Sequence, residues 1–165
     1  MFDSVSRVSR LISYTTVYAA AAGLVVMVLI IAWQVFARYV LSSAPPWSEQ
    51  AALVLMIWFV FLAGAAGVRE QFHIGMDFAL GRLSGRTALV ARALIHVLVL
   101  LFGVALLLGG LELVVRTWSH VMPALGIPRG AAYLPAPASG LLIIFFSLEH
   151  LWAGATGRKV EPLWP

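Results

Sequence analysis

The stretch WSEQAALVLMIWFVFLAGAAGVREQFHIGMDFAL, residues 47–80, decides the fold of this chain. Nineteen residues without a charge lie between Glu49 and Arg69. At a helical rise of 1.5 Å per residue they span roughly 28 Å, close to the hydrocarbon thickness of a bilayer, about 30 Å. We therefore predict one membrane crossing at residues 48–69. Beyond it, Arg69, His73 and Asp77 recur every four residues, so a continuing helix would carry them on one face.

The composition around this stretch is that of an integral membrane protein. The chain has 165 residues, of which 62% are hydrophobic and 11% are charged, whereas soluble domains are about 45–50% apolar and about 25% charged. The absence of cysteine excludes disulfides, thiol chemistry and cysteine-based zinc or iron–sulfur sites. The net charge of +4 comes from basic residues scattered between apolar runs, a pattern that indicates membrane topology rather than nucleic-acid binding.

Three further apolar runs predict three more crossings, at residues 12–37, 89–115 and 132–149. The predicted fold class is thus an all-α integral membrane protein with one four-helix domain covering residues 1–165, and a short interfacial segment on the cytoplasmic side between the second and third crossings. The first run could be a secretory signal peptide, because arginines precede it. We favour an uncleaved anchor, since a signal-peptide core has about 7–15 residues and this run is much longer.

The connections between the crossings differ in character. Residues 41–46 are few, which predicts an antiparallel hairpin of the first two helices, with Ser42, Ser43 and the two prolines capping the second. Helix-breaking prolines and glycines predict an irregular connection over Ser119–Ala132. Residues 63–67 are all small, and the spacing of Ala63 and Gly67 permits close approach by another helix.

Lysine and arginine are unevenly distributed over the two sides of the predicted membrane domain. Eight fall on the side of the termini and three on the other side, the latter being Arg38, Arg116 and Arg129. The positive-inside rule therefore predicts that both termini are cytoplasmic.

The polar residues do not form a recognisable catalytic site, and we predict neither enzymatic activity nor a bound cofactor or metal. The four histidines raise the alternative of a haem- or quinone-associated anchor subunit of a respiratory enzyme, which needs two imidazoles facing each other at membrane depth. A self-sufficient small transporter is a weaker alternative, because no ionisable group is placed in the middle of a crossing and no inverted repeat is present. A chain made only of scaffold helices predicts a partner.

Short motifs in a fixed order relate the chain to a known family. They are RYV at residues 38–40, PWSE at 46–49, WFVFLAGAAGVR at 58–69, HIGMD at 73–77, LGIP at 125–128 and YLP at 133–135. Together they resemble the small membrane subunit of tripartite ATP-independent periplasmic (TRAP) transporters, the DctQ-like family. One departure is Gln50, where that family often has a second glutamate.

The resemblance implies a non-catalytic subunit of a bacterial inner-membrane transporter. The family's large DctM-like subunit carries the substrate and sodium sites and moves as an elevator, and a periplasmic DctP-like binding protein delivers a small organic anion. The small subunit is expected to brace the large one in the lipid bilayer and to help dock the binding protein.

Polar, aromatic and small residues at the ends and on the faces of the predicted helices are our candidates for subunit contact or membrane anchoring. For Arg69 we expect an ion pair with a carboxylate, either in this chain or on the large subunit; the alternative is that the charged residues are only solvated helix ends. The candidates are Arg38, Trp47, Glu49, Trp58, Gly64, Gly67, Arg69, His73 and Asp77.

Overall fold

The structure, a computed structural model, describes residues 2–43, 45–70, 86–158, 160 and 163. Within these ranges the helices are α1 (Phe2–Tyr39), α2 (Pro46–Arg69), α4 (Arg86–Thr117), α5 (Arg129–Tyr133) and α6 (Pro135–Ala155). Helices α1, α2, α4 and the consecutive pair α5–α6 provide four segments long and apolar enough to cross a membrane. The predicted all-α membrane fold is confirmed.

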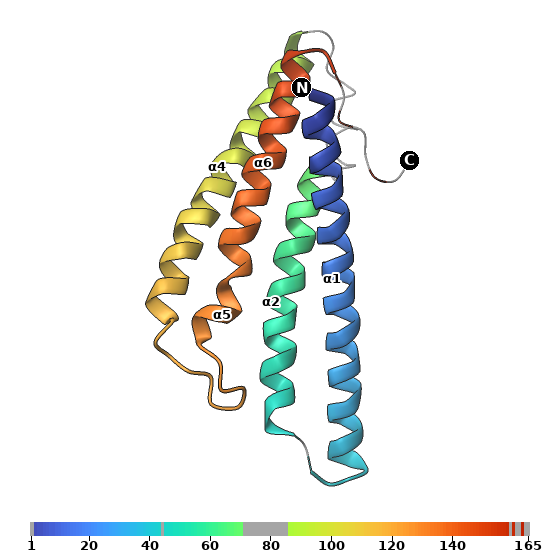
Figure 1. Cartoon of the computed structure of the whole chain (residues 1–165), viewed down its shortest axis with the longest axis vertical. Coiled ribbons are helices and arrows are strands. Elements are labelled where there is room, and N and C mark those ends of the chain that lie inside the picture. The colour runs from blue at the N-terminus through green and yellow to red at the C-terminus, as the bar shows by residue number, and fades with distance from the viewer. Residues whose placement is uncertain (1, 44, 71–85, 159, 161–162, 164–165) are drawn as a thin grey trace.

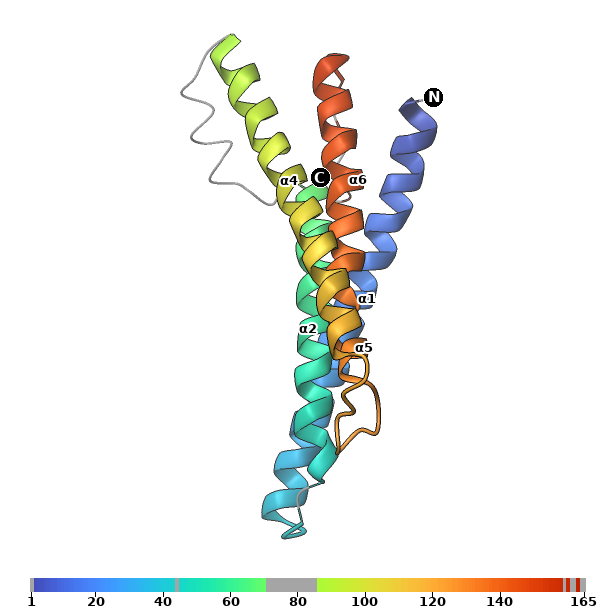
Figure 2. The same ribbon diagram turned by 90° about the vertical axis from the view of Figure 1, so that its left-hand side faces the viewer.

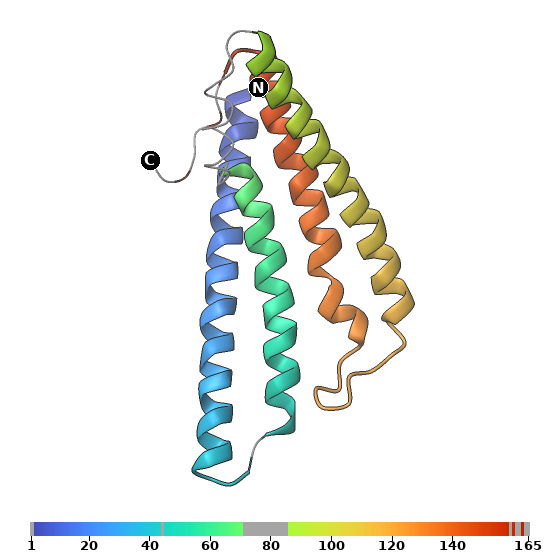
Figure 3. The same cartoon turned by 180° about the vertical axis from the view of Figure 1, so that it is seen from behind.

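The helices form an open row rather than a closed bundle (Figures 1 and 3). Helix α1 packs on α2, α2 on α6 and α6 on α4, whereas α1 and α4 make no contact through their described residues. Figure 2 shows α1 and α4 leaning away from α6 towards the end where the N-terminus lies. Half of the apolar window of the α5–α6 segment is buried, against 6% for α1 and 11% for α2 and α4. Helix α6 is therefore the core of the row.

Glycines bring α4 and α6 into close contact. A Cβ atom on Gly140 of α6 would lie 2.6 Å from the backbone nitrogen of Leu107 and 2.8 Å from the carbonyl oxygen of Gly103, both on α4. A Cβ atom on Gly110 would lie 2.8 Å from Cδ of Pro137. Small residues at a helix contact let the backbones approach and gain van der Waals energy, which drives association in lipid. The α4–α6 hairpin thus depends on glycine at these positions.

The ends of α2 are set by proline and by a turn. Pro46 occupies the first helical position, as expected, where its missing N–H is not needed. The hydroxyl of Ser48, rather than of Ser42 or Ser43, donates to the carbonyl oxygen of Pro45 at 2.7 Å. At its other end α2 stops at Arg69, and Glu70 closes it with a backbone hydrogen bond to Ala66. The predicted interfacial segment after this point lies outside the described residues.

The connection between α4 and α6 is more ordered than the sequence predicted. The expected irregular segment reached Ala132, but α5 begins at Arg129, so the irregular part ends at Pro128. A tight turn precedes α5: Val121 and Pro128 form an isolated bridge, and Gly126 adopts a positive φ of 68°. The helix is interrupted at Leu134, between α5 and α6, because Pro135 and Pro137 lack the N–H groups that a continuous helix would use.

We expect Gly140→Ala to destabilise the protein. The added methyl group would meet backbone atoms of α4, which cannot rotate away, and overpacking of this kind costs about 1–3 kcal/mol. The free energy of unfolding in mixed detergent micelles measures the effect. Gly109→Ala is the control, because nothing lies within 4 Å of a Cβ atom at Gly109. Equal stability of the two variants would contradict the close α4–α6 contact.

Candidate functional site: a buried ionic cluster

The end of α2 meets the beginning of α1 and the end of α6. On α1, Ser9, Ser13, Thr16 and Ala20 recur every three or four residues and are all buried, so they form one narrow face of the helix. Their small size lets α2 and α6 approach that face. On α6, the neighbouring residues Glu149 and His150 are buried as well. These segments together enclose the last residue of α2.

That residue, Arg69, is 1% exposed, although arginine is almost never fully buried without a partner. Its Nε donates to Oγ of Ser9 at 2.8 Å, and the Ser9 hydroxyl in turn donates to Oε2 of Glu149. Nε of Arg69 also lies 3.6 Å from Glu149 Oε2, within ion-pair distance. Nη1 of Arg69 pairs with Glu70 at 3.0 Å. We expected a carboxylate partner for Arg69, and two lie within the chain: those of Glu70 and Glu149.

Glu70 holds three segments at once. Its Oε1 accepts from Ser13 on α1 at 2.8 Å and from Arg69 at 3.0 Å. Its Oε2 accepts from the backbone N–H of Leu163, in the tail after α6, at 2.6 Å. Hydrogen bonds to an ionised group are roughly twice as strong as neutral ones. Glu70 thus fastens the carboxy-terminal tail to α1 and α2.

Two histidines extend the cluster to α4. Nε2 of His150 lies 3.1 Å from the carbonyl oxygen of Arg69, an acceptor left unpaired by the end of α2. The ring of His150 stacks on that of His96 from α4, with 4.8 Å between centroids and 4° between planes. We call Ser9, Ser13, Arg69, Glu70, Glu149 and His150 the ionic cluster, and His96 covers it from α4.

The ionic cluster is better suited to fixing helix positions than to adding net stability. The side chains of Arg69 and Glu149 are 0% exposed and that of Glu70 is 1% exposed, so each charge has lost its hydration. Nη2 of Arg69 and Oε1 of Glu149 have no partner among the described residues. Desolvation of a buried ion pair can exceed its Coulombic gain, whereas breaking such a pair costs about 3–5 kcal/mol. The cluster therefore penalises every arrangement of the helices that separates its members.

The geometry does not support catalysis or haem binding at the cluster. Ser9 is completely buried and its hydroxyl contacts Arg69 and Glu149 rather than a histidine, so Ser9 is not arranged as an activated nucleophile. His96 and His150 present their ring faces to each other, whereas two axial ligands must point their nitrogens at an iron between them. Among the described residues, no group of three or more His, Asp or Glu is arranged to hold a metal.

The other predicted contact residues that the structure describes are not members of the ionic cluster. Arg38, Trp47 and Glu49 are exposed near the α1–α2 turn, at the opposite end of α2. Trp58 is 39% exposed in the middle of α2, and Gly64 is exposed with nothing within 4 Å of its would-be Cβ atom. Gly67 is half-buried, two residues before Arg69. His73 and Asp77 lie outside the described residues. Subunit contact or membrane anchoring by these residues stays a prediction.

Sequence reasoning missed most of the cluster. The predicted fourth crossing ends at residue 149, but α6 continues to Ala155, which places Glu149 and His150 inside the helix. The serines of α1 were not singled out. A usable signal was present in both cases: an acidic residue inside a continuing apolar run, and small polar residues at helical spacing along an otherwise bulky helix.

Comparisons with known proteins agree with this architecture. A family model described as "Tripartite ATP-independent periplasmic transporters, DctQ component" matches residues 27–157. The chain belongs to the DctQ family. This match includes all of α2, α4 and α6 but only the last part of α1, so the α4–α6 hairpin and four of the six residues of the ionic cluster lie within the family region. It is therefore a component of a TRAP transporter and a multi-pass protein of the inner membrane, and membership implies a complex with a large DctM-like subunit.

Individual relatives differ in how much of their length this DctQ protein covers. It is 21% identical over 126 residues to the sialic acid TRAP transporter small permease protein SiaQ of Vibrio cholerae, covering 76% of this chain and 73% of the relative. It is 25% identical over 181 aligned positions to the C4-dicarboxylate TRAP transporter small permease protein DctQ of Vibrio cholerae, covering 93% and 76%. The isethionate TRAP transporter permease protein DctMQ of Oleidesulfovibrio alaskensis is 27% identical over 132 residues, which is 74% of this chain and only 21% of that relative.

We expect Arg69→Ala to lower the free energy of unfolding by about 3–5 kcal/mol, because it leaves Glu70 and Glu149 buried without a cation. Arg69→Lys should cost less, since it keeps the charge but cannot reach both Ser9 and Glu70. Unfolding in mixed micelles measures both. Arg116→Ala is the control: Arg116 pairs with Glu112 at 2.6 Å but both side chains are more than half exposed, so the loss should be about 0.3–0.5 kcal/mol. A similar loss in the Arg69 and Arg116 variants would refute the structural role of the cluster.

Proposed function

We propose that this DctQ protein is a non-catalytic brace for the large membrane subunit of a TRAP transporter. The observation that carries the proposal is the open row of helices. Three of the four membrane segments leave about nine-tenths of their apolar windows unburied by the chain itself, while the ionic cluster and the α4–α6 glycines hold the row in one arrangement. A rigid array with unpaired apolar faces suits a scaffold that packs on a larger protein.

In this role the protein takes part in a transport reaction that is divided among several proteins. The large subunit moves the substrate across the membrane, driven by an ion gradient, and the small subunit keeps the fixed part of the complex in place. We propose a small organic anion as substrate, because the relatives are named for isethionate, sialic acid and C4-dicarboxylates. A periplasmic binding protein delivers it. The relative called DctMQ, much longer than this chain, supports the pairing with a large subunit.

The exposed small residues of α2 are the proposed contact with the large subunit. Ala65 and Ala66 face inward and are fully buried within the chain, whereas Ala63 and Gly64 face outward. A surface of small residues allows a neighbouring helix to approach closely. The surface formed by Ala63 and Gly64 is left exposed by the chain itself.

We expect Gly64→Leu to reduce recovery of the large subunit in a pull-down from membranes that express the whole transporter. A leucine there would hold the partner helix away, and a penalty of about 1–3 kcal/mol corresponds to a loss of affinity of roughly fivefold to a hundredfold. The fold of this chain should survive, because nothing lies within 4 Å of a Cβ atom at Gly64.

Gly109→Leu is the matched control for this experiment. Gly109 is an exposed glycine of α4 with equally open surroundings, and recovery should remain at the level of the unchanged chain. Undiminished assembly and uptake with Gly64→Leu would sink the proposed α2 contact.

We further propose that both termini are cytoplasmic and that the connection before α5 is periplasmic, where the binding protein docks. The arginine and lysine distribution supports this orientation. Because the chain has no cysteine, single cysteines introduced at Ser119 and Thr156 report the two sides without interference. An impermeant maleimide added to intact spheroplasts should label Ser119→Cys and spare Thr156→Cys. The reverse labelling pattern would show the opposite topology and would contradict the proposed periplasmic docking site.

A further inference from the structure

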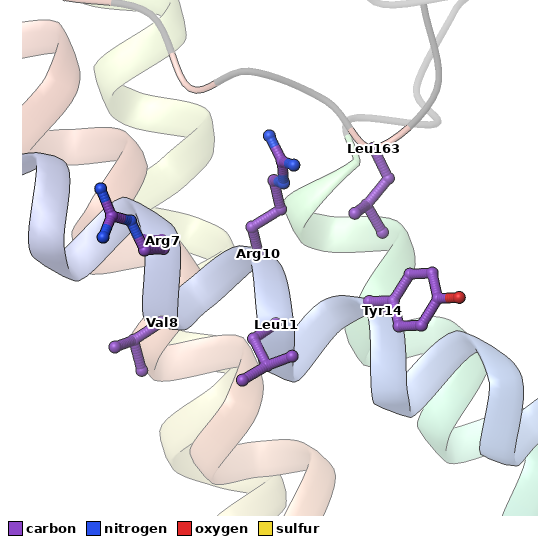
Figure 4. Close-up of a pocket in the computed structure, with 6 residues that line it drawn as sticks. All are labelled: Arg7, Val8, Arg10, Leu11, Tyr14 and Leu163. Atoms are coloured by element: carbon purple, nitrogen blue, oxygen red, sulfur yellow. The ribbon is translucent and has the colours of Figure 1, made fainter.

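A pocket on the outer face of α1 is not used by the ionic cluster. It has a volume of about 510 Å³ and is lined by Arg7, Val8, Arg10, Leu11 and Tyr14 of α1 together with Leu163 of the tail. Figure 4 shows Arg10 and Tyr14 on the side of α1 nearest Leu163, with Val8 and Leu11 pointing away from the two guanidinium groups. Ser9 and Ser13 lie on the opposite face of the same turns, within the cluster. The two faces of α1 thus have separate tasks.

No side chain that the structure describes neutralises the charges of this pocket. Arg7 and Arg10 are exposed, and neither forms an ion pair with a carboxylate whose side chain the structure describes. Arg69 and Arg116, in contrast, have carboxylate partners. Two guanidinium groups three residues apart on one helix face form a concentrated positive site, so a ligand for this pocket must be anionic.

The apolar residues of the pocket indicate what kind of molecule carries the anionic group. Val8 is 54% exposed and Leu11 is 64% exposed, and both lie in the first turns of the segment Val5–Tyr39, which is long and apolar enough to cross a membrane. Arginine guanidinium binds phosphate through paired hydrogen bonds, and tyrosine is favoured at the boundary between headgroups and acyl chains. Basic pockets next to membrane helices bind anionic lipid headgroups.

We propose that this pocket binds the phosphate of an anionic glycerophospholipid in the leaflet at the N-terminal end of α1. The guanidinium groups of Arg7 and Arg10 hold the phosphate, while Val8 and Leu11 lie against the acyl chains. Contact with Leu163 places the lipid beside the tail that Glu70 fastens to the helices. The inference rests on the membrane location of the chain and does not depend on the proposed bracing role.

Native mass spectrometry of the full chain tests the proposal. The protein is given equal amounts of phosphatidylglycerol and phosphatidylcholine with identical acyl chains, and the bound fractions are compared. We expect preferential binding of phosphatidylglycerol. Because each arginine near the surface contributes about 1 kcal/mol towards an anionic lipid, Arg7→Gln and Arg10→Gln should each weaken that binding about fivefold, and the double variant should bind both lipids alike.

Arg38→Gln is the matched control. Arg38 is an exposed arginine at the other end of the same helix, without an ion-pair partner among the described residues and outside the pocket. Its loss should leave the phosphatidylglycerol preference unchanged. An equal effect of Arg38→Gln, or no preference in the unchanged chain, would overturn the proposal. Soluble glycerol phosphate should fail to compete; effective competition would show a site for free phosphate and refute the lipid assignment.

Discussion

The guanidinium of Arg69, buried at the end of α2, is the constraint on which the rest of the structure depends. The guanidinium is removed from water, so it requires polar partners within the protein. Ser9 of α1, Glu149 of α6 and the adjacent Glu70 lie at hydrogen-bonding or ion-pair distance from it. His150 then binds the carbonyl group of the same residue. These partners come from α1, from the end of α2 and from α6, and together they define the height and rotation of three helices. Apolar packing alone would allow those helices to slide along one another in a bilayer, because lipid tails are as apolar as the side chains.

The α4–α6 hairpin and the contact between α1 and α6 are held by different physical means. Helices α4 and α6 are joined by backbone proximity at Gly103, Gly110 and Gly140, an interaction without charge that is strongest where shapes match. Helices α1 and α6 barely touch, and the ionic cluster supplies the link between them. This division explains how a row of helices, which lacks the mutual support of a closed bundle, can keep one arrangement and still leave most of its apolar surface available to lipid and to another subunit.

The sequence predicted the architecture well because membrane crossings depend on composition over long runs. Charges at Glu49, Arg69 and Arg129 mark the limits of uncharged stretches, and Pro46 marks the start of a helix, so the helices could be placed from local information. The ionic cluster could not be predicted in the same way. It depends on Ser9, Arg69 and Glu149 meeting in space, and each of these residues alone resembles an ordinary residue near the end of a membrane helix. Glu70 likewise follows Arg69 directly at the end of an uncharged run, where charged residues are common.

The chain order of the cluster has a consequence for biosynthesis. Ser9 and Arg69 leave the ribosome before Glu149 does, and α4 must also be inserted before α6 can close the site. Until then, Arg69 has only Glu70 and the serines of α1 as partners, and the first hairpin cannot complete the burial of its own cation. Insertion of α6 is therefore the step that joins the α1–α2 hairpin and α4 into one body. A nascent chain that stops short of this helix exposes an unfinished polar site, the kind of feature by which membrane quality control distinguishes incomplete proteins from finished ones.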